Sequence, residues 1–172
     1  MKLVIAAMVL AQVSDTITVT ATRTETRVAD TPASVVVLSQ ETLRATAAPT
    51  LDDALRQVAG FTLFRRAGSR VANPTAQGVT LRGVGASGAS RALVLDDGVP
   101  LNDSGNYAIY SNQQLDPEVI ETVNVSLGTT DVDSPTASAA GGTVAYRTRV
   151  PGEEFGGRFS VSIGDFNYRR FF

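Results

Sequence analysis

The first clear pattern along the chain is the run 15–22, in which apolar and hydroxyl-bearing side chains alternate. Side chains alternate between the faces of an extended chain, so Ile17, Val19 and Ala21 share one face. This pattern predicts a β-strand. The polar, aperiodic stretch 23–31 predicts a flexible linker. The strand is either an ordinary edge strand of the domain behind it, which the residues alone favour, or a strand that adds to another protein's sheet.

Two short helices are expected next, after an apolar strand at 35–38. Ser39 can cap a first helix over residues 40–46. Thr50 and Asp53 stand at the spacing of a capping box, which indicates the start of a second helix. The second helix has one apolar face with residues at i, i+3, i+4 and i+7. The residues of that face are Leu51, Ala54, Leu55 and Val58.

The remaining pattern predicts strands that are separated by turns and long polar loops. Gly60 is placed as the residue that ends the second helix, and Asp97-Gly98 is a hairpin signal. Asp116 and Pro117 favour a short helical turn. The expected strands are 61–64, 79–83, 91–95, 121–127 and 141–148, and the long polar loops are 65–77 and 102–114.

Beyond Pro151 the chain alternates strictly, with Phe159, Val161 and Ile163 on one face. Gly-Asp at 164–165 interrupts this pattern, and another apolar stretch then runs to the last residue. An apolar strand without a closing signal is an unusual end for a soluble domain. We therefore expect a strand hairpin here that belongs to a truncated sequence.

The composition excludes several kinds of chemistry. The 172 residues include no cysteine and no histidine, which removes disulfides, thiolate metal sites and the commonest general base. No catalytic residue, metal site or cofactor is therefore expected. The formal net charge of −2 gives no field that would favour nucleic acid. Lys2 and the apolar run 3–11 predict a signal peptide over 1–14, with a buried N-terminal strand or helix as the alternative.

Seven short motifs, in collinear order, resemble motifs of the TonB-dependent outer-membrane receptor family. The strongest is LVLDDGVPL at 93–101, which resembles the family's VLIDGVPL. DTITVTA at 15–21 resembles the TonB box, most closely the version in ferric hydroxamate receptors. Each motif alone is weak, but their shared order makes coincidence improbable. The other five motifs lie at 31–35, 51–61, 79–83, 117–128 and 139–144.

The resemblance implies an α+β fold, the plug of a TonB-dependent receptor, with a small mixed β-sheet, short helices and long loops. The plug is expected to be followed by the first hairpin of an outer-membrane β-barrel, which is truncated here. The implied divisions are a signal peptide at 1–14, the TonB box and linker at 15–30, the plug domain at 31–150, and the start of the barrel at 151–172.

The resemblance also implies protein partners. In family members the TonB box pairs as a strand with the C-terminal domain of the periplasmic protein TonB. Arg82 and Glu121 match positions where the plug contacts the barrel, but a second contact arginine of the family is Leu127 here. The residues expected to bind TonB are Asp15, Thr16, Ile17, Thr18, Val19, Thr20 and Ala21.

Ligand contact is expected on the loops 65–77 and 102–114. The arginines of the first loop suit an anionic ligand, and the second loop offers Asn and Tyr side chains. The alternative is that these loops are solvated and their arginines pair with barrel carboxylates. Iron would arrive already chelated, since no His or Cys is present, and ferric siderophores are the family's commonest substrates. The candidate ligand-binding residues are Arg65, Arg66, Arg70, Asn102, Asp103, Asn106, Tyr107 and Tyr110.

Three functions are open to such a chain. The first is the plug of an energy-coupled transporter, located in the cell outer membrane as part of a full-length receptor. The second is a stand-alone plug-like module that binds TonB or a chelate without transport, located in the periplasm if the chain ends at residue 172. An enzyme is disfavoured because no nucleophile–base pair can be built from His or Cys.

Overall fold

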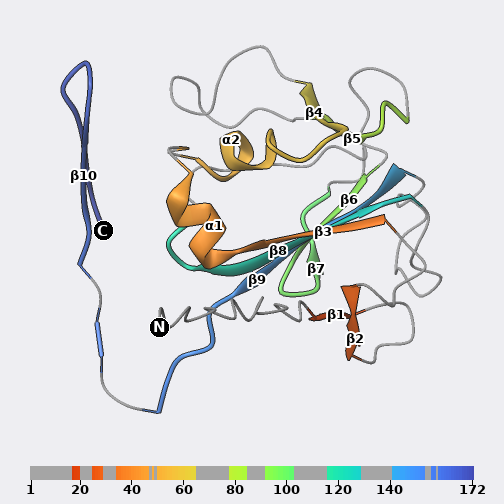
Figure 1. Cartoon of the computed structure of the whole chain (residues 1–172), viewed down its shortest axis with the longest axis horizontal. Helices are drawn as coiled ribbons and strands as arrows, with labels where there is room; N and C mark the ends of the chain where they lie inside the picture. Colours follow the sequence, from red (N-terminus) through yellow and green to blue (C-terminus); the bar gives the residue numbers. More distant parts are fainter. Residues whose placement is uncertain are drawn as a thin grey trace, which may run out of the picture.

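The computed structural model describes residues 17–19, 25–28, 34–46, 48, 50–64, 78–84, 92–102, 116–128, 141–153, 156–157 and 159–172. At its centre lies a five-stranded mixed β-sheet with two short helices on one side (Figure 1). The fold is therefore the predicted α+β class. In spatial order the strands of the sheet are β3 (Ser34–Ser39), β8 (Ile120–Leu127), β9 (Gly142–Thr148), β6 (Ala92–Asp96) and β7 (Val99–Pro100).

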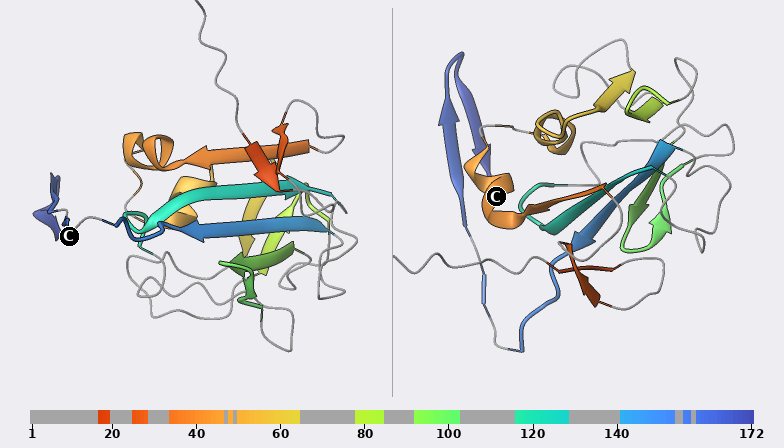
Figure 2. Two further views of the ribbon diagram at one scale, coloured as in Figure 1. Left: turned by 90° about the horizontal axis from the view of Figure 1, so that it is seen from below. Right: turned by 45° about the vertical axis from the view of Figure 1, so that its right-hand side comes forward.

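The sheet joins segments that are far apart in the sequence. β3 pairs antiparallel with β8, so that Ser34 lies opposite Leu127, and β8 pairs antiparallel with β9. β9 and β6 are parallel, with Ala92 opposite Gly142. Figure 2 shows β3, β8 and β9 side by side in one layer. These pairings confirm the predicted strands and make the sheet mixed.

One face of the sheet packs against the helices and carries the core. In β8 the alternating residues Val123, Val125 and Leu127 are buried, as the sequence pattern predicts. Val144 and Tyr146 of β9 lie opposite them in the register and are buried as well. Large apolar side chains from adjacent strands thus form one continuous apolar surface, whose burial stabilises the fold.

The first helix confirms its predicted cap. α1 (Gln40–Ala45) follows β3 directly, and the Ser39 hydroxyl accepts a hydrogen bond from the Thr42 N–H at 3.2 Å. This bond satisfies one of the donors that a helix leaves free at its start. Leu43 is the buried residue of α1 and joins the core under the sheet.

The second helix is shorter than predicted. α2 (Leu51–Leu55) ends at Leu55, so the prediction that Gly60 ends it is wrong. The next amides, including those of Arg56 and Val58, bond to the third residue back, and these 3₁₀-type bonds tighten the chain out of the α-helix. The predicted apolar face is nevertheless confirmed, because all of its residues are buried: Leu51, Ala54, Leu55 and Val58.

A separate two-stranded sheet lies beside α2 (Figure 1). β4 (Phe61–Phe64) and β5 (Gly78–Leu81) pair antiparallel, with Phe61 opposite Leu81. Both of these residues belong to the main apolar core. β5 ends at Leu81 rather than at the predicted Gly83, because Arg82 and Gly83 take positive φ angles that a strand does not allow.

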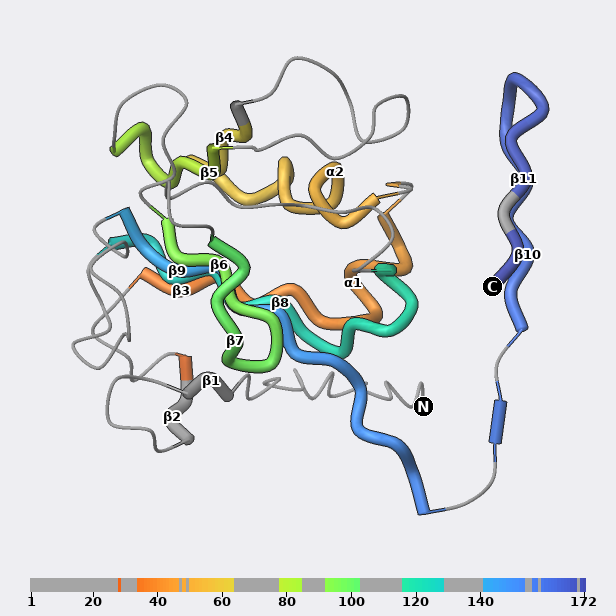
Figure 3. Tube along the Cα trace, turned by 180° about the vertical axis from the view of Figure 1, so that it is seen from behind, coloured from red at the N-terminus to blue at the C-terminus, as the bar shows by residue number. Residues whose placement is uncertain are grey.

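The C-terminal segment forms a hairpin that stands apart from the sheet in Figure 3. β10 (Val161–Gly164) pairs antiparallel with β11 (Tyr168–Phe171). Mutual backbone bonds between Ser160 and Phe172, at 2.7 and 3.0 Å, extend the pairing. The predicted strand is therefore confirmed from Val161 onward, and Ile163 on its apolar face is 81% exposed.

Candidate functional site

The predicted TonB-binding segment forms one half of a small hairpin. β1 (Ile17–Val19) pairs antiparallel with β2 (Glu25–Arg27). The predicted strand is confirmed over β1, but the prediction of a flexible linker is wrong at β2. Folding back lets β2 pair with backbone groups of β1 that the sequence pattern left without a partner. The remaining residues of this predicted site, Asp15, Thr16, Thr20 and Ala21, lie outside the described residues.

Arg82, a predicted barrel-contact residue, lies in a tight turn at the end of β5. The Val84 N–H donates to the Leu81 carbonyl at 3.1 Å and closes the turn. Arg82 and Gly83 occupy its centre with φ of +54° and +69°, the signs of a type I′ turn. Side chains other than glycine pay about 1–2 kcal/mol for the left-handed conformation. The Arg82 side chain is exposed beside this strained turn.

Glu121, the second predicted barrel-contact residue, lies in a β-bulge at the start of β8. The pairing of β8 with β9 skips one residue of β8 between Ile120 and Thr122. The extra residue changes which side chains face the core, so Ile120 and Val123 are both buried although they stand three positions apart. The bulge leaves Glu121 exposed at the edge of the core.

Arg82 and Glu121 lie at opposite ends of the sheet. Arg82 follows Leu81, whose side chain lies beside Gly142 at the start of β9. Glu121 lies near Thr148 at the end of β9. At about 3.3 Å per residue, the length of β9 separates them by roughly 20 Å. The two residues cannot share one partner group.

Asn102 has a structural role in the sheet. Its side-chain carbonyl accepts from the Val94 N–H at 2.8 Å, and its amide donates to the Ala92 carbonyl at 3.1 Å. The side chain thus continues the hydrogen bonding of β6 where β7 ends. The sequence places Asn102 at the start of a ligand loop, but its amide already serves the backbone here. The other candidate ligand-binding residues lie outside the described residues: Arg65, Arg66, Arg70, Asp103, Asn106, Tyr107 and Tyr110.

The turn between β6 and β7 carries two adjacent carboxylates in different environments. Asp97 and Gly98 have φ of +47° and +85°, which confirms the predicted hairpin turn. The Asp97 carboxylate accepts bonds from the Thr148 hydroxyl and from its N–H, at 2.9 Å for the latter, and these bonds lower the pKa of Asp97. Burial, and then the charge of Asp97, raise the pKa of Asp96. One carboxylate is therefore stabilised as an anion and the other is not.

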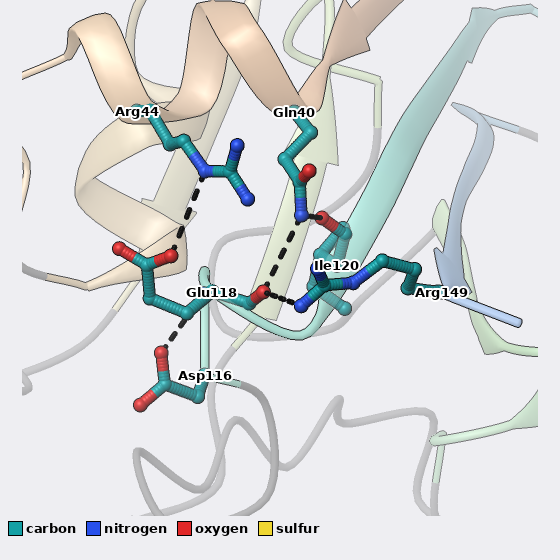
Figure 4. A network of polar contacts seen from close by, with 6 residues as sticks. All are labelled: Gln40, Arg44, Asp116, Glu118, Ile120 and Arg149. Carbon is teal, nitrogen blue, oxygen red and sulfur yellow. Dashed lines mark hydrogen bonds and ion pairs between the residues drawn. The ribbon is translucent and has the colours of Figure 1, made fainter. Parts of the chain in front are cut away.

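A polar network joins α1, the 116–119 turn and the end of β9 (Figure 4). Gln40 donates to the carbonyls of Glu118 and Ile120 at 3.4 and 3.2 Å. The Arg149 guanidinium donates to the Glu118 carbonyl at 3.2 Å, and the Arg44 Nε lies 3.6 Å from a Glu118 carboxylate oxygen. The network fixes the point at which the chain leaves the sheet toward the C-terminal hairpin.

Within the described residues no group of three or more His, Cys, Asp or Glu side chains gathers around a possible metal position. None of the helices in the same part of the chain is long and apolar enough to cross a membrane.

The family is decided by a comparison of the whole sequence. The sequence model described as TonB-dependent Receptor Plug Domain matches residues 27–143, more than half of the chain. The chain belongs to this family. The match begins at the last residue of β2 and extends through the central sheet into β9. The resemblance and the fold class that the sequence indicated are both confirmed.

The plug domain has relatives among much longer receptors. A hemin receptor of Yersinia enterocolitica is 30% identical over 171 residues, which cover 91% of this chain and 22% of that protein. The ferripyoverdine receptor of the Pseudomonas aeruginosa outer membrane matches with a TM-score of 0.67 and 24% identity, over 91% of this chain and 19% of its own. The alcaligin outer-membrane receptor FauA of Bordetella pertussis matches with a TM-score of 0.66 and 20% identity, over 90% and 25%.

These relatives are receptors, and the chain spans a quarter or less of their length. The structural likenesses lie below 25% identity and show the fold of the plug domain alone. The sequence motifs identified the family correctly. They did not indicate the Glu118 network or the Asn102 bonds, because both depend on contacts between distant segments.

Proposed function

We propose that the chain is the plug region of a longer outer-membrane receptor that takes up a scarce ligand with energy supplied through TonB. The observation that carries the proposal is the β10–β11 hairpin directly behind the plug domain. Phe159, Val161 and Ile163 alternate along it and are exposed, as expected for a strand that meets lipid on one face. The proposal retains the signal peptide at 1–14 and the barrel start at 151–172.

The TonB-binding site in this proposal is the segment 15–21. β1 is an extended strand at its centre, and a strand can add to another sheet through backbone bonds. The hairpin with β2 is short, and an isolated two-stranded hairpin is marginally stable in water. A partner strand can therefore displace β2 or pair with the edge of β1 that faces away from β2.

Arg82 and Glu121 are proposed to contact the surrounding barrel at two separate places. Both side chains are exposed, and they lie at opposite ends of the sheet. Carboxylates of the barrel suit Arg82 as bidentate partners. Two contacts roughly 20 Å apart, the length of β9 at about 3.3 Å per residue, restrain the plug against rotation better than a single contact.

The ligand that we propose is iron in an organic chelate, a ferric siderophore. The relatives include receptors named for ferripyoverdine, alcaligin and hemin, and these names support a chelate as the ligand. The chain has no histidine or cysteine, so its own side chains suit contact with the chelator rather than direct ligation of iron. The loops 65–77 and 102–114 remain the proposed contact segments.

Reading the DNA beyond the codon for Phe172 tests the receptor proposal. An open frame that continues with alternating strands supports it, and a stop codon would favour a stand-alone binding module. Binding of ferric siderophores and of hemin to the resulting receptor would then be compared by fluorescence quenching. Tight binding of hemin alone would overturn the siderophore assignment.

Titration with the C-terminal domain of TonB tests the docking segment directly. The 172-residue chain is compared with a variant that lacks residues 15–21. Calorimetry should show binding to the intact chain and none to the deletion variant. Equal binding by both chains would contradict the assignment of the segment.

A further inference from the structure

The Arg82 backbone is hydrogen-bonded to Gly60. Gly60 directly precedes β4, and Arg82 directly follows β5. The Arg82 N–H donates to the Gly60 carbonyl at 2.7 Å. Since Phe61 lies opposite Leu81, this bond adds one further pair at the end of the ladder. Gly60 and Arg82 therefore lie opposite each other, although they are far apart in the sequence.

Gly60 leaves room that any other residue would fill. Its φ is +86°, and a Cβ built on it would lie 3.3 Å from both the Cγ and the backbone nitrogen of Arg82. Distances of this size are tighter than ordinary van der Waals contact, so Arg82 would have to shift by a few tenths of an ångström. The aliphatic stem of Arg82 thus lies against the bare α-carbon of Gly60.

We propose that Gly60 is a positioning residue for Arg82. Its missing side chain makes room for the Arg82 stem, and its carbonyl holds the Arg82 amide in the strained turn. Together these contacts limit the rotation of the exposed Arg82 side chain. The functional role of this positioning rests on the proposed plug–barrel contact. The positioning itself depends only on contacts between described residues.

The turn carries an arginine at a position where other residues would be less strained. Asn, Asp or Gly would occupy the first central position of a type I′ turn without the same cost. A long side chain that is already restrained before it meets a carboxylate pays a smaller entropic cost on binding. Gly60 therefore acts on the contact through Arg82 and does not touch the carboxylate itself.

The first test uses the isotope-labelled 172-residue chain and two matched alanine variants. Gly60→Ala adds a Cβ beside Arg82, whereas Gly98→Ala adds one at nearly the same φ, +85°, with nothing within 4 Å. We expect Gly60→Ala to shift the NMR signal of the Arg82 Nε–Hε group and Gly98→Ala to leave it unchanged. An Arg82→Lys variant identifies the signal by its loss. Equal shifts in the two alanine variants would overturn the proposal.

A second variant separates positioning from general misfolding. Gly60→Asn also adds a Cβ, but asparagine tolerates positive φ better than alanine does. We expect it to shift the Arg82 signal and to speed hydrogen exchange of the Arg82 amide about two- to tenfold, the loss expected for one weakened hydrogen bond. Native far-ultraviolet circular dichroism with an unchanged Arg82 signal would count against the positioning role.

The third test uses the longer receptor and measures ligand uptake by cells. Gly60→Ala should lower uptake in the parent receptor and have no further effect in an Arg82→Ala background. Independent, multiplicative losses would overturn the view that Gly60 acts through Arg82. If Arg82→Ala leaves uptake unchanged, the plug–barrel contact fails, while the NMR comparison still decides the positioning role.

Discussion

At the scale of single residues, Gly142 shows how a missing side chain allows close packing. Gly142 opens β9 with φ of +122°. A Cβ there would collide with the Ser126 carbonyl oxygen and would lie 2.8 Å from the Leu81 side chain. The contact with a backbone oxygen cannot be relieved by a rotamer change, so this position requires glycine.

We predict that Gly142→Ala strongly destabilises the plug domain. Overpacking and positive-φ strain together should lower the free energy of unfolding by about 3 kcal/mol or more. Gly128→Ala is the control, because Gly128 has a φ of +121° and nothing within 4 Å of the added carbon. Urea unfolding measures both variants. Equal losses would show that strain alone, without the collision, decides the cost.

The neighbouring Asp96 and Asp97 predict opposite effects of pH. The pKa of Asp97 is lowered, so its contribution to stability is present above the unfolded-state pKa and is lost as pH falls through the folded-state pKa. The pKa of Asp96 is raised, so its ionisation disfavours folding at neutral pH. The stability that Asp97 contributes is therefore lost in acid, below the ordinary aspartate pKa of 3.8.

We predict that Asp97→Asn lowers the melting temperature at pH 7 and flattens its fall in acid. Asp96→Asn should raise the melting temperature at pH 7, because it removes a poorly solvated charge whose Oδ1 has no partner in the described residues. Thermal unfolding measured from neutral pH down to about pH 3 distinguishes the two variants. Changes of the same sign at pH 7 would contradict this assignment.

At the scale of elements, β1 binds through its backbone in the proposed docking. Proline lacks the N–H donor and fixes φ, whereas alanine retains both the donor and the freedom. We predict that Ile17→Pro weakens binding of the TonB domain at least about tenfold, the loss of one or two backbone bonds. Ile17→Ala is the control and should bind nearly as well as the parent chain. Equal affinities of the two variants, measured by calorimetry, would exclude backbone pairing at this position.

Elements with strong alternation were predictable from the sequence, and elements set by distant contacts were not. The strand at β8 and the cap at Ser39 follow from local pattern and chemistry. The end of α2 was misplaced because 3₁₀-type bonds replace the α-helical ones after Leu55. β2 was missed because its three residues show no pattern without β1 beside them.

At the scale of the whole molecule, the Glu118 network connects the chain's exit to the helical side of the sheet. Gln40 bonds two backbone carbonyls in a partly buried position, whereas the Arg44–Glu118 pair is partly exposed. The sequence did not reveal the network because Gln40 and Glu118 are far apart along the chain. Family motifs predicted the fold, and the contacts between distant segments came only from the structure.

We predict that Gln40→Ala costs more stability than Arg44→Ala, although both residues lie on α1. Loss of the bonds to the two carbonyls should cost about 1–2 kcal/mol, and loss of the exposed ion pair less than about 1 kcal/mol. Urea unfolding at moderate salt measures both changes. A larger loss of unfolding free energy for Arg44→Ala would show that the ion pair, and not the carbonyl bonds, stabilises the point where the chain leaves the sheet.

The pairing of β3 with β8 has a consequence for how the protein is made. Ser34 finds its partner only when Leu127 is available, so β3 cannot pair with β8 until all the intervening residues are synthesised. Folds dominated by such late-closing contacts fold slowly and expose apolar strands in the meantime. β3 therefore presents unpaired backbone donors and acceptors until β8 has been made, for a time that the position of β8 in the sequence determines.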